Sequence, residues 1–169
     1  MSTDQLSMFE EERAAADKAA TKFKTFSVSI SRTLPMPAEK IFDRWLIPTF
    51  VGKWMFGEHV GNEKVLDLQN EVRPGGTFNY KVKRNGKEVL LDGEYLEIDR
   101  PNRLSFSWRE TAKANAQKSK VNLSLEPQDG KTRLKLSLQI DRVLEHYGDE
   151  IKQQWTQRLK ALAEQLSKK

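Results

Sequence analysis

Two hydrophobic periods follow one another along the chain and predict a sheet followed by a long helix. From Phe26, apolar side chains occupy every second position, which is typical of a strand with one buried face. Similar segments, separated by short turn motifs, continue to about Asp141. The turn motifs are Pro74-Gly75-Gly76, Asn85-Gly86, Arg100-Pro101-Asn102 and Asp129-Gly130. Consecutive strands with short turns predict an antiparallel meander.

Helical periodicity occurs at two places. After the first strand, Pro37 precedes apolar residues spaced three and four apart, and Pro48 interrupts this helix before a second short one from Thr49 to Met55. The last element is a long helix from about Tyr147, with an apolar stripe made by Ile151, Trp155, Leu159, Leu162 and Leu166. Because a half-buried sheet and an amphipathic helix are each unstable alone, we predict an α+β fold in which they pack together.

The hydrophobic pattern also divides the chain. Ser7 and Glu10 have the spacing of a helix-capping box, but the alanine-rich segment after them has no apolar stripe. We therefore predict a helical N-terminal arm over residues 1–22 and one domain over residues 23–169. Between Glu88 and Ile98 the alternation is irregular, which predicts a β-bulge.

Several segments, in their order along the chain, carry a family resemblance. They are PAEKIFDRW, VGKWMFG, RPGGTFNY, LLDGEYLEIDRPNRLSFSW and the C-terminal helix with Trp155. In this order they resemble the activator of heat-shock protein 90 ATPase homologue family of the START-like superfamily, over about Phe23 to Leu166. The resemblance implies a helix-grip fold, in which a curved antiparallel sheet of about six to seven strands surrounds a long C-terminal helix, with two short helices after the first strand.

The same resemblance implies a function. In many relatives a cavity between helix and sheet accepts apolar small molecules or lipids, so we expect a non-enzymatic binding module. Two alternatives stay open: a co-chaperone that binds heat-shock protein 90 and affects its ATPase, and a cyclase-like enzyme that uses the cavity. The eukaryotic activator has an additional N-terminal domain, where this chain has only about 22 residues.

Aromatic residues are the candidate ligand contacts. Strand parity places Phe78, Tyr80, Phe106 and Trp108 on the sheet side of a cavity, and the hydroxyls of Tyr80 and Tyr95 are candidates to orient a ligand. Trp54 and Phe56 are expected at its mouth and Trp155 on the helix. The alternative for all eight is ordinary core packing.

Other chemistry finds little support in the sequence. The chain has no cysteine, its two histidines are His59 and His146, and it lacks nucleophile-elbow, phosphate-loop and dinucleotide motifs. We therefore expect no catalytic residue, metal site or cofactor that can be named from the sequence. A net charge of +5 is spread along the chain, and no apolar run approaches membrane-spanning length or a signal peptide. Neither nucleic-acid binding nor a membrane span is expected, and the expected location is the cytoplasm.

Overall fold

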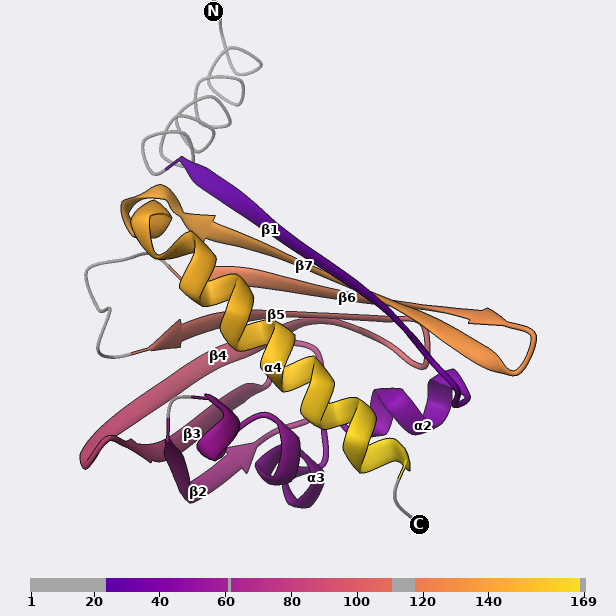
Figure 1. The fold of residues 1–169 in the computed structure, drawn as a ribbon, viewed down its shortest axis with the longest axis horizontal. Helices are drawn as coiled ribbons and strands as arrows, with labels where there is room; N and C mark the ends of the chain where they lie inside the picture. Colours follow the sequence, from indigo (N-terminus) through magenta and orange to yellow (C-terminus); the bar gives the residue numbers. More distant parts are fainter. Residues whose placement is uncertain (1–23, 61, 111–117, 168–169) are drawn as a thin grey trace, which may run out of the picture.

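The computed structural model describes residues 24–60, 62–110 and 118–167, so the expected N-terminal arm lies outside the described residues. Seven antiparallel strands form one curved sheet in the order β1-β7-β6-β5-β4-β3-β2 (Figure 1). Their bounds are β1 Thr25–Leu34, β2 Glu63–Asn70, β3 Thr77–Arg84, β4 Lys87–Asp99, β5 Arg103–Glu110, β6 Ser119–Gln128 and β7 Lys131–Asp141. The first strand pairs with the last, and the other strands follow one another as a meander.

The helices all follow from local sequence signals. They are α2 Ala38–Asp43, α3 Pro48–Trp54 and α4 Gly148–Ser167, with short 3-10 helices η1 Glu58–Val60 and η3 Arg142–Tyr147. Pro48 is the first residue of α3, where its missing N–H is tolerated, whereas α2 already ends at Asp43, so Pro48 begins the second helix and does not interrupt the first. The long helix α4 lies diagonally across the sheet (Figure 1). The predicted α+β helix-grip fold is confirmed.

The predicted apolar stripe of α4 is buried against the sheet. Ile151, Trp155, Leu159, Leu162 and Leu166 are all at most 9% exposed. Their spacing places them on one face of the helix, and the inward residues of the strands meet that face. Sheet and helix therefore bury each other's apolar sides in one core.

The predicted irregularity in β4 is a β-bulge. The pairing of β4 with β5 shifts register between Tyr95 and Glu97, so the extra residue is Leu96, which is exposed. Gly93 has a different role. A Cβ atom at this position would overlap the Ser107 carbonyl oxygen and the Phe78 ring, so glycine is what allows that ring to lie against the strand.

In the described part of the chain, no helix combines the length and the apolar composition needed to cross a membrane.

Candidate functional site

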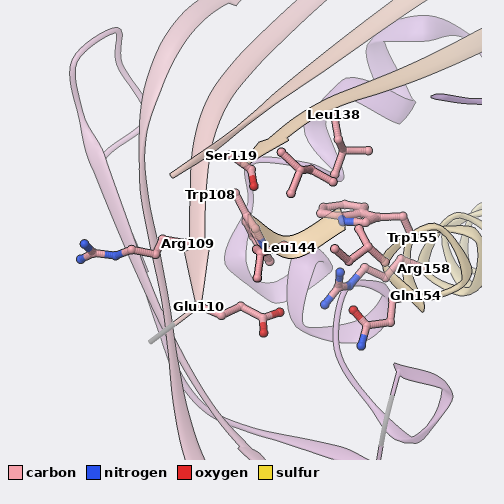
Figure 2. Close-up of a pocket in the computed structure, with 11 residues that line it drawn as sticks. Trp108, Arg109, Glu110, Ser119, Leu138, Leu144, Gln154, Trp155 and Arg158 are labelled. Carbon is pink, nitrogen blue, oxygen red and sulfur yellow. The ribbon is translucent and has the colours of Figure 1, made fainter. Parts of the chain in front are cut away.

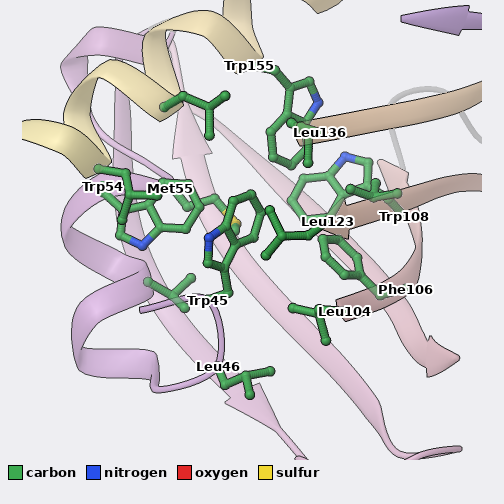
Figure 3. Packing of buried hydrophobic residues seen from close by; sticks show 14 of the residues in the cluster. Trp45, Leu46, Trp54, Met55, Leu104, Phe106, Trp108, Leu123, Leu136 and Trp155 are labelled. Carbon is green, nitrogen blue, oxygen red and sulfur yellow. The ribbon is translucent and has the colours of Figure 1, made fainter. Parts of the chain in front are cut away.

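An aromatic layer fills the middle of the space between sheet and helix (Figure 3). Phe78 is its centre, with ring centroids 4.9 Å from Tyr80, 5.5 Å from Tyr95 and 5.7 Å from Phe106. These side chains, with Trp45, Met55 and Trp108, surround a void of about 10 Å³. A buried water requires roughly 10–15 Å³, so this part of the interior is a packed core.

The tyrosine hydroxyls predicted to orient a ligand have partners inside the protein. The Tyr95 hydroxyl lies 2.9 Å from the Asn70 side-chain amide, which donates to it. Burial raises the pKa of Tyr80, and the neighbouring Tyr95 hydroxyl raises it further. Both hydroxyls are thus held protonated within the core.

Trp54 and Phe56 lie deeper than expected. Both are essentially fully buried, and the Trp54 indole N–H donates to the Arg44 carbonyl oxygen at 2.8 Å. They pack within the core instead of lining an opening: the Trp54 ring lies 4.6 Å from that of Trp45, and the Phe56 ring lies 5.7 Å from that of Tyr80.

A second space lies at the other end of the helix-sheet interface, where the N-terminal half of α4 crosses the ends of β5 and β7 (Figure 2). Its volume is about 40 Å³, enough for at least one water molecule. We refer to this space as the end cavity. Its lining residues are Trp108, Arg109, Glu110, Ser119, Leu138, Ile140, Leu144, Ile151, Gln154, Trp155 and Arg158. Of the eight predicted contacts, the structure brings Trp108 and Trp155 together here, with ring centroids 5.4 Å apart.

One end of this cavity borders a group of buried charges. Arg84 donates to Glu63 from Nε at 2.8 Å and from Nη2 at 2.6 Å, and it donates to Glu110 from Nη1 at 3.1 Å. The Glu63 side chain is fully buried and that of Glu110 is 7% exposed. Arg84 of β3 therefore bridges two buried carboxylates. Glu63 lies on the neighbouring strand β2, and Glu110 lies on β5, on the far side of β4.

Arg158 of α4 is the fourth member of this group. Its side chain is fully buried, and its Nε donates to the Met55 carbonyl oxygen at 2.8 Å. The guanidinium lies over the Trp155 ring at 4.6 Å and within 5.5 Å of the Trp108 ring. Figure 2 shows it directed toward the space in front of Glu110 and Gln154. We call Glu63, Arg84, Glu110 and Arg158 the buried charge cluster.

Two polar atoms in this cluster are left without partners. Among the described residues, none accepts a hydrogen bond from Arg158 Nη2, and none donates one to Glu63 Oε1. Burial raises the pKa of Glu63, against the attraction of Arg158 and Arg84, and burial lowers the pKa of Arg158, against the attraction of Glu63 and Glu110. Because buried polar groups are almost always hydrogen-bonded, the unpartnered Arg158 nitrogen marks this cavity as unusual.

Arg109 differs from the charge cluster although it lines the same cavity. Its guanidinium donates to the Asp92 carboxylate at 3.1 and 3.2 Å and points away from the other lining side chains (Figure 2). Only the inner part of this residue contributes to the wall.

The sequence analysis missed the charge cluster, although the same periodicity indicates it. Arg84 continues the inward series of Phe78, Tyr80 and Val82 in β3, and Glu110 continues the series that ends in Trp108 in β5. Arg158 lies four residues before Leu162, on the buried stripe of α4. A charged residue at an inward position is the signal that could have found them.

Comparison with known proteins places the chain in a family. The family described as "Activator of Hsp90 ATPase homolog 1-like protein" matches residues 35–167. The chain belongs to this family. Among curated proteins, no significant match is found.

Solved structures show the same fold at low sequence identity. The Chromobacterium violaceum protein CV1439 is 23% identical, with a TM-score of 0.73 over 85% of this chain and 98% of that one. A protein of Nitrosomonas europaea is 18% identical, with a TM-score of 0.69 over 82% of this chain and 92% of that one. CalU16 from Micromonospora echinospora is 22% identical, with a TM-score of 0.65 over 85% of this chain and 77% of that one. These similarities show that the chain shares its fold with these proteins.

Proposed function

We propose that this protein is a non-enzymatic binding module that takes up a small hydrophobic molecule or lipid at the end cavity. The observation that carries the proposal is the combination of two indole rings, a surrounding apolar wall and a few buried polar groups at one end. Binding sites for small organic molecules typically have this composition. The filled aromatic layer offers no comparable space.

The size of the cavity requires that part of its wall moves. Pockets for drug-sized ligands hold about 300–1,000 Å³, whereas this cavity holds about 40 Å³. The 3-10 helix η3, which carries Leu144, has no buried residue, so displacing it sacrifices little packing. We infer that η3 is the part of the wall that opens when a ligand binds.

A pair of neighbouring substitutions tests this proposal. Leu144 lines the cavity, whereas the adjacent Val143 is 57% exposed. In an NMR titration with ethylbenzene, Leu144→Trp should weaken binding by about tenfold or more because the indole fills the opening, and Val143→Trp should bind like the wild type. If the unmodified protein binds neither ethylbenzene nor any apolar molecule recovered from a cell extract by native mass spectrometry, the proposal fails.

The cyclase-like alternative requires an ionisable residue at the cavity, and Glu110 and Arg158 line it. Glu110 is the carboxylate nearest to the space, but both of its oxygens lie within hydrogen-bonding distance of Arg84, at 3.1 and 3.4 Å. A carboxylate held in this way is a poor general base, because Arg84 stabilises its ionised form. We therefore place binding ahead of catalysis.

Family membership supports the co-chaperone alternative. The family description refers to activation of the Hsp90 ATPase. An ATPase assay with the chaperone, run with and without this protein, tests it directly: unchanged turnover together with no measurable binding would exclude the role.

A further inference from the structure

On the polar side of the end cavity, one hydrogen-bond donor lacks an acceptor among the described residues. Arg158 Nη2 has no acceptor among the described residues, and the Arg158 side chain is fully buried at the cavity wall. An unmet donor on a buried guanidinium is expensive, since hydrogen bonds to charged groups are among the stronger ones in proteins. An acceptor on a bound molecule would satisfy it.

The charge of that molecule is limited by the cluster around it. Arg84 and Arg158 supply two positive charges, and Glu63 and Glu110 supply two negative ones, so the cluster is already balanced. A carboxylate placed beside Arg158 would add a negative charge next to Glu110, which lines the same cavity. Burying an uncompensated charge costs far more than burying a neutral polar group.

A cation is excluded by the same geometry. The guanidinium of Arg158 lies between the aromatic walls, 4.6 Å from the Trp155 ring and 5.5 Å from the Trp108 ring, and would repel a positive group placed beside it. The remaining chemistry is a neutral molecule with an oxygen acceptor, attached to an apolar body that contacts Leu138, Ile140 and Ile151.

We propose that the end cavity selects neutral molecules with a carbonyl-type oxygen, which accepts a hydrogen bond from Arg158 Nη2, over carboxylic acids of the same size. This specificity rests on the proposed binding function and adds to it the class of ligand. Fatty acids and other carboxylates are therefore the wrong ligands for this site, and ketones, esters or quinone-like molecules are the right ones.

Three probes of similar size separate the contributions. Acetophenone has the acceptor, ethylbenzene replaces its carbonyl by a methylene group, and benzoate is ionised at neutral pH. Affinities are measured by following the indole N–H signals of the protein in an NMR titration. Acetophenone should bind about tenfold more tightly than ethylbenzene, as one hydrogen bond to a charged group predicts, and benzoate should bind more weakly than ethylbenzene.

A charge-balanced variant identifies Arg158 as the source of the preference. Arg158→Met combined with Glu63→Gln removes one charge of each sign, so Arg84 and Glu110 still form a balanced pair. In this double variant the preference for acetophenone over ethylbenzene should fall from about tenfold to about one. Arg100→Met is the matched control, because this arginine lies outside the cavity and its guanidinium binds Asp43; the preference should be unchanged.

The outcomes distinguish a failure of the proposed ligand class from a failure of the proposed binding function. Equal or tighter binding of benzoate, or a preference for acetophenone that persists in the double variant, overturns the ligand class while leaving the binding function in place. If none of the three probes binds the wild type, the ligand class fails, and the binding function fails with it when no apolar molecule is recovered from a cell extract. A thermal denaturation curve of the double variant shows whether it is folded, and Arg158→Lys, which keeps the charge but loses the planar fork, provides a second variant in which the preference should decrease.

Discussion

Two regions of the interface between α4 and the sheet contain buried aromatic rings and share Trp108, yet they differ in how completely they are packed. Around Phe78 the rings interlock and leave about 10 Å³. Around Trp155, two indoles, a buried arginine and a carboxylate surround about 40 Å³, and one hydrogen-bond donor has no acceptor among the described residues. Both regions are buried, so burial alone does not separate them. The difference lies in whether packing and hydrogen bonding are complete, and the incomplete region is where a ligand has something to contribute.

The largest expected effect is the loss of a ring from the filled layer. Phe78→Ala should lower the free energy of unfolding by about 3–5 kcal/mol, because the surrounding rings cannot collapse into the space. Leu66→Ala, at a position 44% exposed, is the control and should stay within about 0.5 kcal/mol of the wild type. Urea denaturation measures both, and similar values for the two variants would contradict a tightly packed layer.

A smaller effect is expected from adding volume in each region. Leu104→Phe, at a fully buried position in the packed core on the same strand as Phe106, should lower the free energy of unfolding by about 1–3 kcal/mol because no space is available. Leu144→Phe places the added atoms toward the end cavity and should change stability by less than about 0.5 kcal/mol. If both substitutions destabilise equally in thermal unfolding, the contrast between the two regions disappears.

The smallest effect is a pH dependence that comes from one carboxyl group. Burial raises the pKa of Glu63 above its ordinary value of 4.5, while Arg158 and Arg84 oppose the shift and Glu110 adds to it. The folded protein therefore holds the Glu63 proton more tightly than the unfolded chain. The stability that this proton contributes is fully present below pH 4.5 and is lost as the pH rises through the raised pKa.

Comparison with Glu63→Gln isolates this contribution. The stability of the wild type relative to the variant should fall as the pH rises above 4.5, because Glu63 then loses its proton whereas glutamine does not titrate. Equilibrium unfolding at several pH values measures the difference. A flat or rising difference would show that the two arginines outweigh the effect of burial.

Most of the fold could be predicted from the sequence, because alternation and helical spacing are repeated over many residues. The parity that places Phe78, Tyr80, Phe106 and Trp108 inward is confirmed by their burial, although their contact with a ligand stays a prediction. The depth of Trp54 could not be predicted, since Trp54 is the last residue of α3 and its burial depends on how α3 packs against α4, which lies far away in the sequence. A repeated pattern tolerates single exceptions, but the packing of a short helix depends on the whole fold.

The charge cluster was harder to predict than the core, for a physical reason. A charged residue on a strand is usually exposed, so Arg84 and Glu110 do not stand out from the many other charged residues when each is considered alone. Their burial is tolerable only because Glu63 and Arg158 arrive from distant parts of the chain and balance them. No local window contains that information.

The pairing of β1 with β7 also affects how the protein is made. Thr25 pairs with Asp141, and Arg158 of α4 donates to Met55, so contacts of the early strand and helices depend on segments that are synthesised much later. The meander from β2 to β5 involves mostly nearby partners and is able to form sooner. Sheet closure requires long loops to be ordered first, which slows folding. During synthesis β1 therefore waits as an unpaired strand, and this interval is the one in which a nascent chain is most exposed to aggregation.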